Sequence, residues 1–227
     1  MPSTATDHAA LRKWYDCNKA HPMYISTPGD GTIIRLAPPE QYFDSHREIY
    51  AVDANGERSR EMLCLSEPEA VRIAVKTITD AFRADPTMFT FGFAPPDGTP
   101  MCHCERCQER LHGITAKHLG RPSLSDTWFH FVNEVAKAVK REFPDRWLLT
   151  NGYANRVYPP EGIAELSDNI GIQFAFLQCC TLHRIGDPGC WQRQDYAEIL
   201  KRWTDLCPVI IYDYDPGVGL ENLPFPA

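Results

Sequence analysis

Three cysteines lie within six residues in the segment Cys102–Cys107, in the pattern C-x-C-x-x-C. Thiolates at this spacing can close around one soft or borderline cation, and zinc bound by sulfur is the commonest site of this kind. A closed tetrahedral zinc site needs four ligands, so a fourth ligand must come from elsewhere in the chain. The candidates are Cys64, His103, and a second group formed by Cys179, Cys180 and His183.

Two other interpretations of these cysteines stay open, namely reduced thiols packed in a loop and a disulfide formed in an oxidising compartment. The chain contains nine cysteines, and an odd number cannot pair completely within one molecule. A chain of 227 residues can also bury a sufficient core without disulfides. The sequence therefore favours metal ligation or free thiols over a disulfide-stapled scaffold.

Charge and composition argue against several classes of partner. The formal net charge is -7 and the isoelectric point is near 5.6, so there is no basic field for a phosphate backbone. No run of about 18 apolar residues occurs, and residues 1–8 lack the apolar stretch of an export signal. We expect no nucleic-acid partner and no membrane segment, and the sequence leaves the localisation open.

Glycine and serine motifs that carry common enzyme chemistry are missing from the sequence. There is no phosphate-binding glycine loop, no dinucleotide fingerprint and no serine nucleophile elbow. We therefore expect no nucleotide cofactor.

Strand and helix signals alternate from about residue 60 onward. Apolar stripes at steps of three and four residues predict helices that begin near Ser66 and Ser125, and a third that carries residues 196–206. Short apolar runs predict strands at residues 62–65, 88–94, 147–150, 170–177 and 209–212. Strands that alternate with amphipathic helices indicate parallel βαβ units with the helices outside.

Five predicted strands are too few to close an eight-stranded barrel, which takes about 250 residues. We expect a single α/β domain with the architecture of a partial (β/α)8 TIM-type barrel, with parallel strands and outer helices; a self-contained open sheet is the alternative. Residues 1–60 form a less regular N-terminal segment at the barrel or its rim, and residues 61–227 form the βα repeats. A partial barrel would expose strand edges, so we expect a homodimer or flanking domains to cover them.

Polar and aromatic residues follow the predicted strands, where the loops of a parallel sheet gather and ligands bind. Carboxylates and amides orient hydroxyl-rich ligands, and aromatic faces cover the apolar side of a sugar ring. We therefore predict a carbohydrate site. Asp97 is the first catalytic candidate, with Asp213 or Asp215 as the second carboxyl group that glycoside cleavage needs. The predicted substrate-binding residues are Asn151, Tyr153, Gln178, His183, Trp191 and Tyr214.

Several of these residues have simpler interpretations. An Asp before Gly is typical of a turn, and Tyr and Trp side chains here pack as readily as they bind sugar. His183 can ligate a metal, shuttle a proton or form an ordinary hydrogen bond in a loop. A nucleophilic role for Cys179 or Cys180 is weaker, because no Asn or Asp partner can be assigned from the sequence.

The predicted parallel arrangement also indicates which residue is the fourth zinc ligand. Cys64 leaves one predicted strand, and the C-x-C-x-x-C segment leaves the next. The four sulfur atoms can then meet on adjacent loops. The resulting prediction is a closed, structural zinc site formed by Cys64, Cys102, Cys104 and Cys107.

A series of short motifs runs in a fixed order over roughly residues 10–227. The motifs are Leu36–Phe43 with His46 and Tyr50, Leu63–Glu69, Pro96–Gly98, the C-x-C-x-x-C segment, Phe131–Ala136, Phe143–Asp145, Cys179–His183, Tyr212–Tyr214 and Leu223–Pro226. Their order resembles a bacterial family catalogued as a domain of unknown function. That family is a glycoside-hydrolase-like barrel that commonly follows an α-glucuronidase-type N-terminal domain in large, often exported proteins.

This resemblance implies a TIM-type barrel in a polysaccharide-related setting, with strands before and after this chain and no assigned catalytic residues. The chain departs from the family pattern at two positions. Gln178 stands where the family has an acidic residue, and Arg184 stands where it has proline. An amide cannot serve as a carboxylate acid or base, so the competing hypothesis is a non-catalytic carbohydrate-binding or structural domain. A metal-dependent hydrolase is a third alternative.

Overall fold

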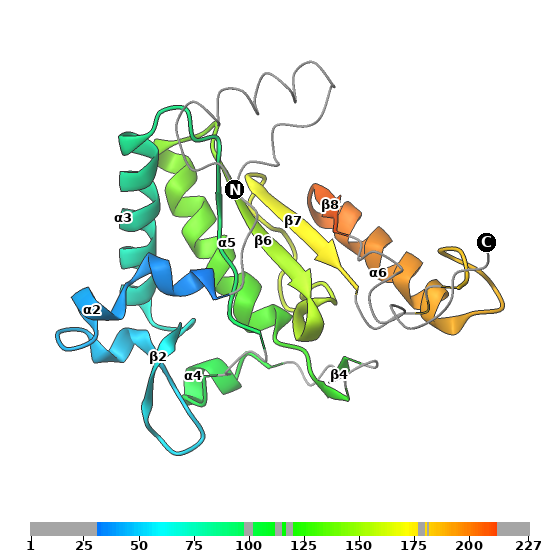
Figure 1. The fold of residues 1–227 in the computed structure, drawn as a ribbon, viewed down its shortest axis with the longest axis horizontal. Coiled ribbons are helices and arrows are strands. Elements are labelled where there is room, and N and C mark those ends of the chain that lie inside the picture. Colours follow the sequence, from blue (N-terminus) through cyan, green and yellow to red (C-terminus); the bar gives the residue numbers. More distant parts are fainter. Residues whose placement is uncertain are drawn as a thin grey trace, which may run out of the picture.

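The computed structural model describes residues 31–97, 102–111, 115–116, 120–176, 180 and 182–212 (Figure 1). Its centre is a four-stranded parallel sheet in the order β3-β6-β7-β8. The strands are β3 (Thr90–Gly92), β6 (Trp147–Tyr153), β7 (Ile170–Ala175) and β8 (Val209–Ile211). Each strand lies beside the preceding strand of this sheet in chain order, as the alternating strand and helix signals predict.

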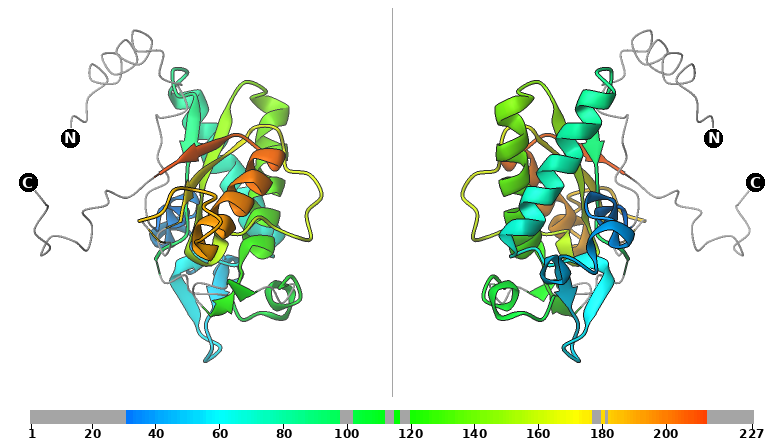
Figure 2. Two further views of the ribbon diagram at one scale, coloured as in Figure 1. Left: turned by 90° about the vertical axis from the view of Figure 1, so that its right-hand side faces the viewer. Right: turned by 90° about the vertical axis from the view of Figure 1, so that its left-hand side faces the viewer.

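Three long helices cover this sheet: α3 (Pro68–Ala84), α5 (Ser125–Glu142) and α6 (Trp191–Leu206). Proline at the first position of α3 suits a helix start, because its fixed φ matches the helix and its missing N–H would be unpaired there. Both α3 and α5 bury apolar residues at steps of three and four. Figure 2 shows these two helices side by side.

The helices α5 and α6 meet the same face of the sheet. Trp128 of α5 donates its indole N–H to Thr150 Oγ1 of β6 at 3.1 Å. A Cβ atom on Gly152 would lie 3.1 Å from Ile172 Cγ2 and 3.4 Å from the indole nitrogen of Trp203 in α6. Because residues 150 and 152 alternate with 151 along the strand, both indoles lie over one face. Glycine at position 152 lets α6 approach this closely.

The core between sheet and helices is aromatic. Phe93 follows β3, and its ring centroid lies 5.8 Å from Trp128 and 6.5 Å from Phe131 in edge-on arrangements. Phe129 meets Trp203 at 4.9 Å and joins α5 to α6. These side chains are buried. They fix the helices against the sheet. The packed helices in turn help to position the loops that leave the strand ends.

The smaller elements surround the ends of this unit. They are η2 (Thr32–Leu36), α2 (Pro39–Tyr42), η3 (Arg47–Ile49), β1 (Tyr50–Val52), β2 (Arg58–Leu63), α4 (Glu105–Gln108), β4 (Thr115–Ala116), β5 (Arg121–Pro122) and η4 (Ala154–Arg156). Hairpin β1–β2 and helix α4 lie at the end toward which β6 points (Figure 1). This is the end where loops of a parallel sheet carry function.

One strand prediction is wrong in its pairing. Residues 62–65 were expected to open the parallel sheet, but β2 pairs antiparallel with β1 in a separate two-stranded sheet, with Leu63 opposite Tyr50. Residues 31–33 instead contact the segment that follows β3, where Gly31 N donates to Pro95 O at 3.3 Å and Ile33 N donates to Ala94 O at 2.9 Å. Hydrophobic periodicity detects a buried strand, but it does not choose the partner.

The other strand and helix predictions agree with the structure to within a few residues. The partial barrel stays a prediction, because a barrel wall and an open sheet covered on one face share this strand order. Within the described part of the chain, no helix is long and apolar enough to cross a membrane.

Candidate metal centre

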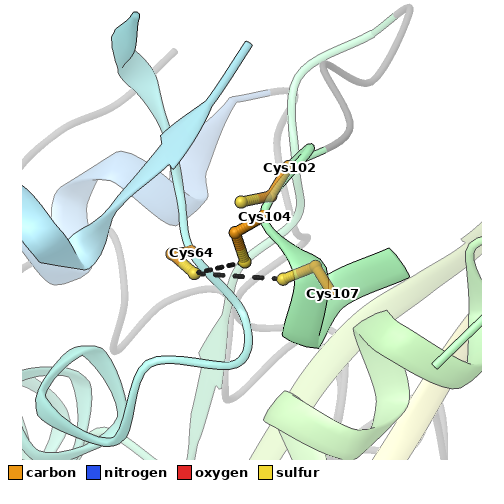
Figure 3. A group of neighbouring side chains, drawn as sticks. All are labelled: Cys64, Cys102, Cys104 and Cys107. Carbon is orange, nitrogen blue, oxygen red and sulfur yellow. Dashed lines mark hydrogen bonds between the residues drawn. The ribbon is translucent and has the colours of Figure 1, made fainter. Parts of the chain in front are cut away.

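Four sulfur atoms from two separate loops gather at one point (Figure 3). Cys64 Sγ lies 3.6 Å from Cys104 Sγ and 3.9 Å from Cys107 Sγ. With Cys102 Sγ included, all four ligand atoms lie within 4.8 Å of one another, and all four cysteines are free thiols. Sulfur atoms bound to a tetrahedral zinc at about 2.3 Å lie about 3.8 Å apart. The spacing of this four-cysteine cluster therefore suits zinc.

Hairpin β1–β2 positions two of the four sulfurs. Cys64 directly follows β2, and its N–H donates to Ile49 O at 2.7 Å. Val52, at the end of β1, donates its N–H to Cys102 Sγ at 3.4 Å and accepts a hydrogen bond from His103 N at 2.7 Å. The residues that open the C-x-C-x-x-C segment are thus aligned along the hairpin.

Helix α4 positions the other two. Cys104 caps the N-terminus of α4, and Cys107 N donates to Cys104 O at 3.0 Å. A spacing of three residues over one helical turn brings these two side chains to the same side. The x-x of the motif is therefore the turn that directs both sulfurs toward Cys64.

Contacts around the cluster hold this loop to the core. Gln108 donates its side-chain N–H to Cys102 O at 2.8 Å, and Thr127 of α5 donates to Cys107 O at 3.3 Å. Arg106 forms an ion pair with Glu67 beside the start of α3. Cys64, Cys102 and Cys107 are at most 4 % exposed, and Cys104 is half-buried. The site is closed and joined to α3, α5 and the hairpin.

The titration of the metal-free thiols reflects their crowding. Hydrogen bonds from Cys107 and Cys64 lower the pKa of Cys102, and the N–H groups of Cys104 and Val52 add to this effect. Hydrogen bonding to Cys102 raises the pKa of Cys64 and raises that of Cys107 to about 12, with burial contributing in both cases. One thiolate is therefore stabilised by neighbouring thiols, and a fully ionised cluster requires a cation among the sulfurs.

A second group of ligand atoms lies in the loop between β7 and α6. Cys180 Sγ lies 3.1 Å from His183 Nδ1, and both lie within 4.8 Å of Cys190 Sγ. The hydrogen bond with His183, together with the N–H groups of Leu182 and His183, lowers the pKa of Cys180 to about 6. The same contact raises the pKa of His183. We call Cys180, His183 and Cys190 the Cys-His cluster.

Two predicted substrate-binding residues lie at the expected end of the parallel sheet. Asn151 and Tyr153 are half-buried residues near the C-terminal end of β6. Asn151 Oδ1 accepts a hydrogen bond at 3.3 Å from Arg156 of η4, which holds the amide toward the loop that follows the strand. Their position agrees with the sequence prediction; their role in binding stays a prediction.

The remaining predicted residues divide between exposed and undescribed positions. Asp97 follows β3 on the surface, Trp191 at the start of α6 is 60 % exposed, and His183 belongs to the Cys-His cluster. Gln178, Asp213, Tyr214 and Asp215 lie outside the described residues. The predicted pairing of Asp97 with Asp213 or Asp215 therefore stays a prediction.

Comparison with known proteins adds one finding. Residues 6–227 match the family described as "Domain of unknown function (DUF4838)". The chain belongs to this family. No curated protein matches the sequence.

Sequence reasoning missed a buried polar group in this DUF4838 chain. Tyr158 donates its hydroxyl hydrogen to Asp195 Oδ2 of α6 at 2.9 Å, and both residues are buried. Trp203 also donates its indole N–H to Val157 O at 2.7 Å. Asp195 lies on the apolar stripe of α6, one residue before Tyr196, and an acidic residue at such a position is the signal that could have revealed it.

Proposed function

We propose that the four-cysteine cluster holds one zinc ion whose role is structural. The observation that carries this proposal is the meeting of four free, mostly buried thiols. Cys64 Sγ lies 3.6 Å from Cys104 Sγ and 3.9 Å from Cys107 Sγ. A set of four thiolates fills a tetrahedral zinc and leaves no position for water. The ion would join hairpin β1–β2 to helix α4 and so fix the loop at the ligand-binding end of the sheet.

Metal analysis of the purified protein tests this role. We expect about one tightly held zinc per chain at this site, and Cys104→Ser should lose both that zinc and thermal stability. Cys207→Ser is the matched control, because Cys207 is a buried free thiol outside both clusters. Protein prepared without chelator that contains no tightly held metal would overturn the proposal.

We further propose that the loops at this end of the sheet bind a polysaccharide or a glycan that carries uronic acids. Support comes from the oriented amide of Asn151 and the aromatic ring of Tyr153 at the end of β6, because amides and aromatic faces are the groups that sugar hydroxyls and ring faces contact. The resemblance of the sequence to a glycoside-hydrolase-like family also supports glycan binding. Asp97 and either Asp213 or Asp215 are the carboxyl groups that a hydrolytic version would use.

Glycan-array binding followed by a reducing-end assay distinguishes a glycoside hydrolase from a non-catalytic carbohydrate-binding domain. Asn151→Ala should weaken binding about tenfold, corresponding to about 1.4 kcal/mol for a lost hydrogen bond, whereas Asn55→Ala in the exposed β1–β2 turn should not. Sustained release of reducing ends that Asp97→Asn abolishes, with binding retained, identifies a glycoside hydrolase. Binding without release identifies a non-catalytic carbohydrate-binding domain, and the absence of any glycan binding overturns both.

A further inference from the structure

The Cys-His cluster is built from the same ligand types as a zinc site but lies in a different loop from the four-cysteine cluster. Its ligand atoms lie within 4.8 Å of one another, and Cys180 Sγ is 3.1 Å from His183 Nδ1. Sulfur and nitrogen ligands of one tetrahedral zinc lie about 3.5 Å apart when the bonds are about 2.3 and 2.0 Å. A shift of about half an ångström in an exposed histidine would reach this spacing.

The loop holds Cys190 in place through its own hydrogen bonds. Cys190 N donates to Asp187 O at 3.1 Å, and Gly189 N donates to Asp187 Oδ1 at 2.8 Å. Gly186, in the left-handed region at φ +75°, donates its N–H to Arg193 O in the first turn of α6 at 2.9 Å. The turn therefore folds back onto the helix start and brings Cys190 toward Cys180 and His183.

We infer that Cys180, His183 and Cys190 form a second zinc site with a coordination position open to an exogenous ligand. Two thiolates and an imidazole select a borderline cation such as zinc over magnesium or calcium, which prefer oxygen ligands. Three protein ligands leave the fourth tetrahedral position for water or another small ligand. Because His183 is exposed, Cys180 is half-buried and Cys190 is buried, the ion would face solvent on the histidine side.

This arrangement differs in kind from the four-cysteine cluster, and the inference does not rest on that cluster or on glycan binding. The Cys-His site would hold an exchangeable ion, because fewer ligands and an exposed side give a chelator access. Zinc with an open position can bind the anionic or hydroxyl oxygen of a small ligand. The chemical class that fits is thus a ligand with one metal-binding oxygen.

Zinc titration of the full chain against a chromophoric chelator tests the inference. We expect about two zinc ions per chain, one released slowly and one rapidly. His183→Ala and Cys180→Ser should each remove the rapidly exchanging ion alone, and Cys104→Ser should remove the slow one alone. Cys207→Ser should retain both. His183 and Cys180 are not core residues, so circular dichroism should stay unchanged in their variants.

Two results would overturn this second site. One is a wild-type chain that never binds more zinc than its His183→Ala variant. The other is a Cys180–Cys190 disulfide found by mass spectrometry of protein purified under mild reducing conditions, since the thiols would then be paired. A wild-type chain that releases one ion rapidly and holds no slowly released ion would instead contradict the four-cysteine site and leave the Cys-His site supported.

Discussion

The two cysteine clusters contain similar candidate ligands in opposite surroundings. The four-cysteine cluster comes from two loops, with Cys64 and Cys102 38 positions apart in the sequence. It lies between a hairpin and a helix, and three of its four thiols are at most 4 % exposed. The Cys-His cluster comes from one loop of eleven residues, and its histidine is exposed. Closure by two chain segments suits a structural ion, and a local, open loop suits an ion that exchanges.

This comparison predicts a large difference in stability. With free zinc at about 1,000 times the Kd of the four-cysteine site, binding adds about 4 kcal/mol to the free energy of unfolding. Cys64→Ala should therefore lower the Tm by about 8–16 °C, on a scale of about 2–4 °C per kcal/mol for chains of this size. If the open site is only half occupied at the same zinc concentration, His183→Ala should cost about 0.4 kcal/mol.

Differential scanning calorimetry at a buffered zinc concentration measures both variants. Cys207→Ser, which removes a thiol from neither cluster, controls for the loss of a cysteine. Equal Tm values for Cys64→Ala and His183→Ala would remove the distinction between a structural and an exchangeable site.

The thiols of the two regions should also differ in reactivity when metal is removed. The His183 contact lowers the pKa of Cys180 to about 6, and burial raises that of Cys207 to about 12. A lowered thiol pKa means that the thiolate is present above pH 6, whereas an ordinary thiol ionises near 9. At pH 7 Cys180 gains about 90-fold in thiolate but loses about 20-fold in nucleophilicity, so its alkylation should be about fivefold faster than that of an ordinary cysteine.

The pH profile of iodoacetamide labelling, followed by peptide mass spectrometry, measures this difference. The midpoint for Cys180 should lie near 6 and move toward 9 in His183→Ala. A Cys180 midpoint that His183→Ala leaves unchanged would show that the imidazole does not stabilise the thiolate. Cys207 should stay largely unlabelled throughout because it is buried and ionises only at high pH.

The sequence predicted the four-cysteine cluster correctly for a partly wrong reason. It expected Cys64 and Cys102–Cys107 to leave adjacent parallel strands, whereas Cys64 follows an antiparallel hairpin strand. Thiol spacing over one helical turn is local and can be read from sequence, but the pairing of β2 depends on which distant edge it meets. The four cysteines still meet as predicted, because Cys64 follows its strand into the loop region that contains Cys102–Cys107 in either arrangement; their binding of zinc stays a prediction.

The fold was more predictable than the candidate site. Apolar stripes on α3, α5 and α6 and apolar runs at β3, β6, β7 and β8 follow from the periods of helices and strands, so their positions agree with the prediction. Contacts such as that of Asn151 with Arg156 depend on a loop that the helical or strand period does not encode. Cys190 was missed for the same reason, since its partners come together only when the loop turns back onto α6.

The smallest predicted effect concerns the ion pair of Arg106 with Glu67, which links the helix of the four-cysteine cluster to the start of α3. The side chain of Arg106 is 54 % exposed and that of Glu67 is 18 % exposed, so solvent screens much of the attraction. Such a pair contributes less than about 1 kcal/mol. The ion pair helps to hold Cys104 and Cys107 near Cys64, because α4 is a single turn.

Arg106→Ala should speed zinc release to a chelator about twofold, equivalent to about 0.4 kcal/mol. Arg72→Ala is the matched control, since it removes an exposed partner of Glu69 on α3 without touching the cluster. Equal release rates for both variants would mean that the cysteines and their backbone hydrogen bonds alone set the lifetime of the bound ion.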